Sequence, residues 1–345
     1  MKPMIQGVFF MPKREPGPDL IRCLAFFFVV VFHSFLYNGY SMERQAGWPM
    51  LLSGSLRWLS VSCIGLFLML SGYLKQDQDA KKCFRSLPPV LVGYLLAAVV
   101  SIPLRHFLLG DPQPLAVWLE RLLSFRGVYY GWYVEMYVGL ALLMPFVNLL
   151  LAQLKTTKQL LTLALILLSL TALPGATALP ILPGYWKSIY PLTYYVLGAI
   201  IRRARPRVAP VAAISVSLVT ALALGTATVL STDGTIHEAF TQQFADLWIA
   251  VIAVSLFLGT YRVRLSPRLG QVLAFCAKGC YGGYLLSHLL DSWAYGILPQ
   301  WHTPQSYWKL FFCVSIPIFA VSILLGHLLQ AAAGMPFSTG RRVAA

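Results

Sequence analysis

Charged residues are scarce in this sequence, and acidic residues most of all. Only 12 of the 345 residues are Asp or Glu, and charged residues of both signs make up 11% of the chain, against about 25% in soluble globular domains. This composition excludes an ordinary soluble domain. Hydrophobic residues make up 58% of the sequence and its mean hydropathy is +0.68, which predicts an integral membrane protein that crosses the bilayer many times.

Recognisable cysteine patterns are also lacking. The six cysteines include no Cys-x-x-Cys pair and no Cys/His ligand spacing, so we expect neither a disulfide framework nor a metal site. The formal charge of +15 raises nucleic acid as an alternative partner. However, the cations lie in short clusters between apolar runs, as in the cytoplasmic loops of membrane proteins. We therefore expect membrane lipid, and no nucleic acid, as a partner.

Apolar runs about as long as a membrane-spanning helix recur along the whole chain. They predict an all-α integral membrane protein with about ten transmembrane helices and no soluble domain. The ten runs lie at about residues 20–37, 57–74, 87–108, 132–152, 158–174, 188–202, 208–230, 243–261, 269–290 and 308–330. Asp19, just before the first run, is a candidate N-cap residue for the first helix.

The positions of lysine and arginine predict the orientation in the membrane. With the N-terminus inside, the inner segments hold 18 of the 27 Lys and Arg residues, and the outer segments, with Arg57 among them, hold 7. Because cations concentrate on the cytoplasmic side, both termini are predicted to be cytoplasmic. We expect a cytoplasmic leader at 1–18, a single membrane domain at 19–330 and a cytoplasmic tail at 331–345. The expected location is the cell membrane, the bacterial inner (plasma) membrane, in multi-pass form.

Two outer segments have a distinct character. Residues 109–131 contain a short amphipathic pattern with Trp118, Leu119 and Leu122, which predicts a helix lying on or dipping into the outer interface. The outer loop 231–242 carries Asp233, His237 and Glu238 and no cation.

The first apolar run contains two residues that are unusual inside a membrane, Arg22 and His33. They are eleven residues apart, so on a helix they point within about 20° of each other and lie about 16 Å apart in depth. Polar groups are costly inside a bilayer, and such residues often mark a functional site. In the alternative interpretation, Arg22 extends to the headgroups and His33 hydrogen-bonds a neighbouring helix.

Further cations gather at the predicted inner face. The end of the second run, Ser71 to Lys75, and the following Lys81, Lys82 and Arg85 surround a turn of small residues. Fixed cations of this kind can hold a phosphorylated cytoplasmic ligand. The orientation rule already accounts for Lys81 and Lys82, so Arg22 and Arg85 are the better candidates for ligand binding.

The outer half of the membrane domain contains different chemistry. His33, Glu135 and His288 are predicted at similar depth, where a histidine with an orienting carboxylate can form a general-base site. Alternatively, Glu135 pairs with Arg126 or Arg57, and His288 belongs to the interfacial aromatic belt. The roles of Asp291 and of Lys278, which lies mid-helix, stay open.

These motifs together resemble the membrane-bound acyltransferase-3 family. The family's hallmark, Arg-x10-His in the first helix, stands here as Arg22 and His33. A phenylalanine followed by Leu-Ser-Gly at the end of the second helix stands as Phe67 and Leu70-Ser71-Gly72, and an arginine before a proline as Arg85 and Pro88 or Pro89. A tryptophan-to-proline helix runs from Trp132 to Pro145 with Glu135 inside it.

A fifth motif departs from the family's pattern. YGGYLLSHLLD resembles the family's Ser-Phe-Gly-Ile-Tyr-Leu-x-His, but its histidine, His288, comes one residue late and no serine precedes. Together with GWYVEMYVGL, this stretch looks closest to a branch that includes the membrane domains of vancomycin-resistance serine racemases.

The resemblance implies an O-acyltransferase that moves an acyl group, most simply acetyl from acetyl-CoA, to a hydroxyl of a cell-surface or lipid-linked glycan. It implies His33 and Glu135 as catalytic residues and Arg22, Arg85, Ser71 and Gly72 as donor-binding residues. His33 is expected to act as general base or as a transient acyl carrier. Two other classes stay open. One is a transporter of a small solute such as an amino acid, and the other is a non-catalytic sensor or scaffold.

Overall fold

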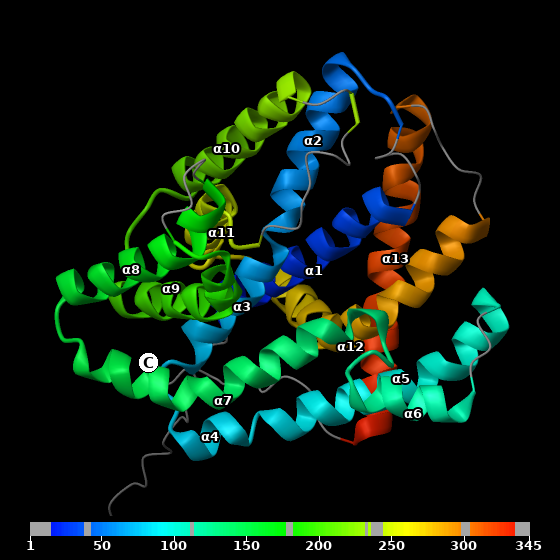
Figure 1. Ribbon diagram of the computed structural model, residues 1–345, viewed down its shortest axis with the longest axis horizontal. Coiled ribbons are helices and arrows are strands. Elements are labelled where there is room, and N and C mark those ends of the chain that lie inside the picture. The colour runs from blue at the N-terminus through cyan, green and yellow to red at the C-terminus, as the bar shows by residue number, and fades with distance from the viewer. Residues whose placement is uncertain are drawn as a thin grey trace, which may run out of the picture.

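The computed structural model describes residues 15–37, 43–110, 114–176, 182–231, 234–235, 244–297 and 304–334, and these residues form helices and loops without a strand (Figure 1). In chain order the helices are α1 (Pro16–Tyr37), α2 (Gly47–Val61), α3 (Cys63–Lys75), α4 (Ala80–Phe84), α5 (Leu87–Leu109), α6 (Leu115–Leu123), η2 (Tyr129–Gly131), α7 (Trp132–Gln153), α8 (Thr157–Ala176), η3 (Gly184–Ile189), α9 (Tyr190–Ala204), α10 (Pro210–Ser231), α11 (Leu247–Thr260), α12 (Pro267–Ile297) and α13 (Pro304–Ala333).

The all-α membrane class is confirmed, while the count of ten spans is not. Each of the ten apolar runs coincides with a helix, and among the described residues seven helical stretches are long and apolar enough to cross a membrane. They are Pro16–Tyr37, Gly47–Lys75, Ala80–Phe107, Tyr129–Gln153, Thr157–Pro174, Pro210–Ser231 and Phe311–Ala333. Helices α9 and α11 have only 15 and 14 residues, and α12 is long but richer in polar and small residues.

Both ends of the chain lie partly outside the described residues. This applies to residues 1–14 of the predicted leader and to residues 335–345 of the predicted tail. The three charged or titratable residues of the outer loop, Asp233, His237 and Glu238, also lie outside them. The cytoplasmic location of the termini therefore stays a prediction.

The second apolar run is longer than the sequence predicts. Helices α2 and α3, separated at Ser62, together extend from Gly47 to Lys75. Arg57 therefore lies well inside this helical stretch rather than in an outer loop, and the loop assignment is wrong. Its side chain is 2% exposed and its guanidinium lies 5.5 Å from the ring centroid of Phe32 on α1.

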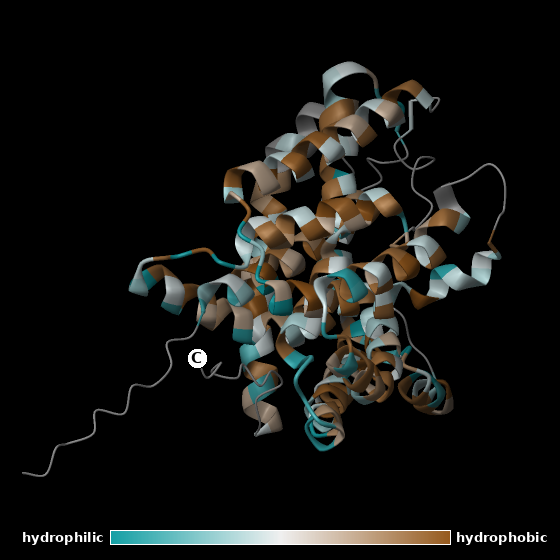
Figure 2. Cartoon of the chain, turned by 90° about the vertical axis from the view of Figure 1, so that its left-hand side faces the viewer, coloured by the Kyte–Doolittle hydropathy of each residue, from teal (hydrophilic) through white to brown (hydrophobic). Residues whose placement is uncertain are grey.

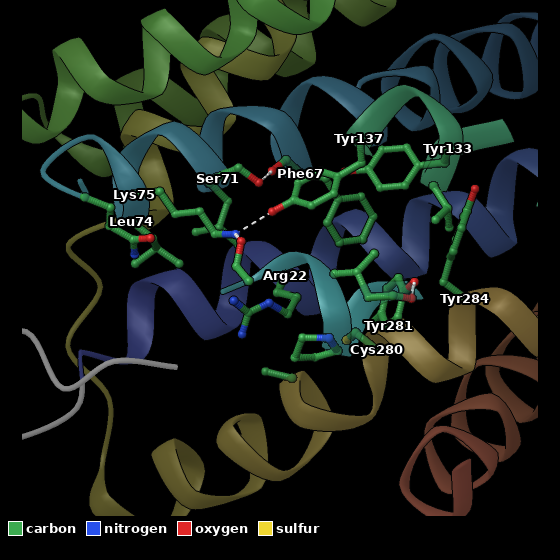
Figure 3. Close-up of a pocket in the computed structure, with 17 residues that line it drawn as sticks. Arg22, Phe67, Ser71, Leu74, Lys75, Tyr133, Tyr137, Cys280, Tyr281 and Tyr284 are labelled. Carbon is green, nitrogen blue, oxygen red and sulfur yellow. Dashed lines mark hydrogen bonds between the residues drawn. The ribbon is translucent and has the colours of Figure 1, made fainter. Parts of the chain in front are cut away.

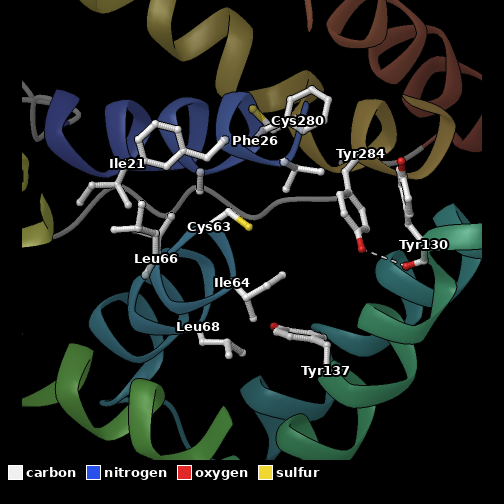
Figure 4. Packing of buried hydrophobic residues seen from close by; sticks show 14 of the residues in the cluster. Ile21, Phe26, Cys63, Ile64, Leu66, Leu68, Tyr130, Tyr137, Cys280 and Tyr284 are labelled. Atoms are coloured by element: carbon white, nitrogen blue, oxygen red, sulfur yellow. Dashed lines mark hydrogen bonds between the residues drawn. The ribbon is translucent and has the colours of Figure 1, made fainter. Parts of the chain in front are cut away.

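Helix α1 lies at the centre of the bundle, against α2, α3, α12 and α13. Its residues Ile21, Ala25 and Phe26 are fully buried. Figure 4 shows Ile21 and Phe26 facing α3 on one side and Cys280 of α12 on the other. A helix that is apolar all round is a buried helix, which agrees with the enclosed position of the helix that carries Arg22 and His33.

Glycines set the close approach of two helix pairs. A Cβ on Gly72 of α3 would lie 1.9 Å from the carbonyl oxygen of Tyr195, and one on Gly198 of α9 would lie 1.9 Å from that of Met69. Likewise, a Cβ on Gly326 of α13 would lie 2.0 Å from the carbonyl oxygen of Gly279 on α12. Small residues let helix backbones approach closely in membranes, where packing rather than water expulsion drives association.

Asn148 on α7 fixes the turn between α3 and α4. Its Nδ2 donates to the carbonyl oxygens of Lys75 and Gln78, both at 2.9 Å, and its Oδ1 accepts from the hydroxyl of Tyr195 at 2.8 Å. One buried amide thus bonds two backbone carbonyls of the turn, in addition to the Gln78 N–H that reaches the Lys75 carbonyl at 2.9 Å.

Large apolar side chains cover the outside of the bundle. Leu142, Phe146 and Leu149 on α7 and Val211 and Val219 on α10 are all more than half exposed. In Figure 2 the hydrophilic colour gathers in loops and helix ends, whereas the helices are largely hydrophobic in colour. An apolar exterior of this extent is the surface that a lipid bilayer covers.

The predicted amphipathic helix is present as α6, and its location on the outer side stays a prediction. Leu115, Leu119 and Leu123 are exposed along one side of it. Trp118 is buried on the other side, with the guanidinium groups of Arg105 and Arg121 at 5.7 and 5.6 Å from its ring centroid.

We predict that Gly326→Leu disrupts the α12–α13 contact. Because the new side chain has no space beside the Gly279 carbonyl, the free energy of unfolding should fall by about 1–3 kcal/mol. The measurement is equilibrium unfolding of the purified protein in lipid–detergent micelles. Gly139→Leu on α7 is the matched control, since a Cβ there meets nothing within 4 Å, and an equal loss in both variants would contradict the packing argument.

We also predict that Asn148→Ala loosens the α3–α4 turn. Two carbonyls would lose their buried donor, which costs about 2–3 kcal/mol in total. Amide hydrogen exchange should quicken in residues 76–86 and stay unchanged in α10. Thr226→Val, which removes a hydroxyl that bonds a carbonyl of its own exposed helix, is the control. Unchanged exchange in the turn would contradict the assignment.

Candidate active site

A cavity of about 170 Å³ opens inside the bundle (Figure 3). Its wall comes from α1, α3, the α4–α5 turn, α5, α7 and α12, so it lies where segments distant in the sequence meet. It is lined by Arg22, Phe67, Leu70, Ser71, Leu74, Lys75, Gln78, Ser86, Pro89, Val90, Tyr133, Val134, Tyr137, Ala277, Cys280, Tyr281 and Tyr284.

Two cations stand at one end of this cavity. The guanidinium of Arg22 lies 3.5 Å from a carboxylate oxygen of Asp19, one turn earlier on α1. The ammonium of Lys75 donates to the hydroxyl of Ser86 at 2.9 Å and to the hydroxyl of Tyr137. Both acceptors of Lys75 are neutral, so these contacts leave its charge available to an anionic ligand.

The walls beyond these cations are apolar and aromatic. Figure 3 shows Tyr133, Tyr281 and Tyr284 on the side of the cavity away from Lys75, while the Tyr137 ring extends from that side to the Lys75 ammonium. The hydroxyl of Tyr281 donates to the Val90 carbonyl at 2.7 Å, which leaves its ring as the lining surface. A chamber with charge at one end and rings along its length suits a ligand with an anionic head and a less polar arm.

His33 lies outside this cavity, near the C-terminal end of α1. Its Nδ1 lies 2.7 Å from the carbonyl oxygen of Val29. A carbonyl can only accept a hydrogen bond, so Nδ1 carries the proton and Nε2 keeps its lone pair. This tautomer is the one that can accept a proton from a substrate through Nε2.

A cluster of aromatic rings surrounds the His33 imidazole. The ring centroid of Tyr130, in η2, lies 4.3 Å from that of His33. His288 of α12 stacks on Tyr129 with centroids 4.3 Å apart and planes 15° apart, and its centroid is 5.3 Å from that of Tyr130. The structure therefore brings both predicted histidines to one cluster, with tyrosines between them.

Tyr130 joins the histidine cluster to the cavity. Its carbonyl oxygen accepts a hydrogen bond of 3.0 Å from the hydroxyl of Tyr284, a cavity-lining residue. Its own hydroxyl donates to Oδ2 of Asp291 at 2.9 Å. The two layers that the sequence analysis separates by depth thus meet at a single short segment, η2.

Only some of the six predicted site residues lie at the cavity or in the aromatic cluster. Arg22 and Ser71 line the cavity, and His33 lies in the aromatic cluster. Gly72 is buried against α9, and Arg85 is exposed beside the cavity-lining Ser86.

The structure does not bring Glu135 to His33. The buried face of α7 contains Val134, Tyr137 and Ala141, and Glu135 is rotated away from it with an exposed side chain. Lys278, whose role stays open in the sequence analysis, is exposed on α12. Its carbonyl oxygen accepts a hydrogen bond from the Gln330 side chain.

Sequence reasoning missed two features of this region. Lys75 was grouped with the inner cations but not singled out, although it ends the Leu-Ser-Gly-Tyr-Leu-Lys motif. Asp291 was noted without a role. The signal for it was available, because Tyr284, Ser287 and Asp291 recur at helical spacing and make one polar stripe on α12.

Comparison with known proteins bears on the chemistry of this region. A family model of the acyltransferase-3 type, described as an acyltransferase domain, matches residues 15–327. Neither a curated protein nor a solved structure matches the chain. Because the family match covers most of the chain and includes the Arg22–His33 helix, the cavity and the Asp291 stripe, the protein belongs to the acyltransferase-3 family.

Proposed function

We propose that this membrane acyltransferase moves an acyl group, most simply acetyl, from cytoplasmic acyl-CoA to a hydroxyl of a cell-surface or lipid-linked glycan in the cell membrane. One observation carries the proposal. A cavity with Arg22 and Lys75 at one end reaches Tyr284, which bonds Tyr130 beside the His33 imidazole. A single hydrogen bond, from Tyr284 to Tyr130, thus lies between the cavity with its anion site and the candidate general base.

The cationic end of the cavity suits the donor. Acyl-CoA combines phosphate groups with an extended pantetheine arm, and Arg and Lys are the side chains that bind phosphates best. In the proposal, Arg22 and Lys75 bind the phosphates, and the arm lies along Ser71 and the tyrosine rings. Arg85, exposed next to Ser86, contacts the part of the donor that stays outside the cavity.

His33 supplies the chemistry at the other end. Its Nε2 accepts the proton of the acceptor hydroxyl while that oxygen attacks the thioester carbonyl. The carbon–sulfur bond then breaks, an ester forms, and the proton leaves with the CoA thiol. In the variant of this scheme with a covalent intermediate, Nε2 itself attacks the thioester carbonyl, and the carbon–sulfur bond breaks to release the CoA thiolate. The acceptor oxygen then takes the acyl group from Nε2, and its proton passes to the thiolate. The Nδ1–Val29 bond favours the same tautomer in both schemes.

We predict that His33→Gln lowers acyl transfer by about 10²–10⁴-fold, the usual contribution of general base catalysis. The measurement is transfer of labelled acetyl from acetyl-CoA to alkali-labile esters in membranes that contain the protein. Glu135→Gln, an exposed residue on α7, should keep the wild-type rate. Wild-type transfer by His33→Gln would remove His33 from the mechanism. Serine uptake into proteoliposomes without any acyl donor would instead support a transporter.

We predict that Arg22→Ala and Lys75→Met each raise the KM for acetyl-CoA by about 10-fold or more, because each removes a charge-assisted contact to phosphate worth about 1.5–3 kcal/mol. Arg85→Ala should have a smaller effect, since its side chain is exposed. Lys155→Ala is the matched control, an exposed cation whose ammonium bonds a carbonyl of the α7 end. Equal KM values in all four variants would contradict the assignment of the donor site.

A further inference from the structure

Asp291 is a buried carboxyl group inside the bundle that the proposed reaction does not use. It lies on α12 with an exposed fraction of 0%. Burying a carboxyl group in an apolar bundle is costly unless hydrogen bonds compensate. In the part of the chain that the structure describes, its Oδ1 has no hydrogen-bond partner, so this position is only half satisfied.

The one hydrogen bond that Asp291 does make is directed at the candidate active site. Its Oδ2 accepts from the hydroxyl of Tyr130 at 2.9 Å. Tyr130 is itself 1% exposed and its ring contacts His33 at a centroid distance of 4.3 Å. The Tyr130 ring therefore lies between the Asp291 carboxyl group and the His33 imidazole and contacts both.

Contacts with neighbouring residues restrict the backbone position of Tyr130. Its carbonyl oxygen accepts from Tyr284, and the following residue, Gly131, lies so close to the Phe125 carbonyl that a Cβ there would be 2.1 Å from it. The backbone of η2 is thus fixed by neighbours on two sides. The remaining variable is the direction of the Tyr130 ring, which its hydroxyl sets through hydrogen bonds to Asp291 and to the Tyr37 side chain.

We propose that Asp291 is a positioning residue, which through the Tyr130 hydroxyl holds the Tyr130 ring against His33 and so fixes the imidazole for proton or acyl transfer. This inference rests on the proposed function. It gives Asp291 the orienting role that the sequence analysis expects of Glu135. If Asp291 acts by orienting the Tyr130 ring, removal of either partner of their hydrogen bond should abolish the orienting effect. Replacement of the carboxyl group by a neutral acceptor of the same shape should preserve it.

The test uses Tyr130→Phe, Asp291→Ala, their double variant and Asp291→Asn in the full-length protein. Tyr130→Phe and Asp291→Ala should each lower kcat for acetyl transfer by about 10- to 100-fold through misplacement of the imidazole. The KM for acetyl-CoA should stay unchanged, because neither residue lines the cavity. The double variant should be no slower than Tyr130→Phe alone, since that change already removes the hydrogen bond to Asp291. Asp291→Asn keeps an acceptor oxygen and should recover most of the rate.

Controls separate this inference from general damage to the fold. Ser287→Ala, on the same buried stripe of α12, removes a hydroxyl that bonds the Tyr284 carbonyl and should keep the wild-type kcat. Tyr130→Phe retains the ring volume, so the test stands even if Asp291→Ala fails to fold. Binding of CoA to each purified variant reports on the intact donor cavity.

Four results would contradict the role of Asp291 as a positioning residue. Wild-type kcat in Tyr130→Phe, multiplied losses in the double variant, an Asp291→Asn variant as slow as Asp291→Ala, or a change confined to KM would overturn the inference. An inactive wild-type protein would overturn the proposed function as well. An active wild type with unaffected variants would overturn this inference alone.

Discussion

The cost of a polar group inside an apolar bundle is the constraint on which this structure depends. A buried polar side chain needs a partner within the protein, on its own helix or on another element, because water is not available there. Asn148 of α7 therefore bonds the α3–α4 turn, Lys75 bonds α7 and the α4–α5 turn, and Asp291 of α12 bonds η2. These bonds fix the walls of the cavity and the surroundings of His33. The polar contacts that hold the helices together are thus also the contacts that shape the site.

The sequence predicts the helices well because the information is local. Every apolar run became a helix, and the spacing of Arg22 and His33 placed both on one side of α1. The pairing of helices is different, because it depends on surfaces that are far apart in the chain. Nothing local shows that Gly72 will meet the Tyr195 carbonyl rather than a ligand. The position of Arg57 was misjudged for a related reason, since the apolar stretch continues through Ser53 and Ser55 to Gly47 despite its small polar residues.

The same limit explains the outcome at the site. Depth along a helix can be counted from the sequence, so His33, Glu135 and His288 could be assigned to one layer. Rotation about the helix axis can be inferred only where one face differs from the others. Helix α7 is apolar on its exposed side as well as its buried side. Its hydrophobic pattern therefore does not show that Glu135 lies on the exposed side. Helix α12 does show a polar stripe through Tyr284, Ser287 and Asp291, so periodicity identifies the carboxyl group that lies in the cluster.

The arrangement of two layers on one helix has a consequence for the proposed reaction. A cytoplasmic donor and an external acceptor must meet without opening a continuous path through the membrane. In this molecule the cavity and the His33 cluster are separated by the Tyr284–Tyr130 contact, a single hydrogen bond of 3.0 Å. That bond runs from the Tyr284 side chain to a main-chain carbonyl of η2, so the Tyr284 ring can turn without moving the backbone, whereas the helices nearby are held by close glycine contacts. In the proposed reaction, the contact between the donor cavity and the His33 cluster is therefore made by one side chain and one short segment rather than by a whole helix.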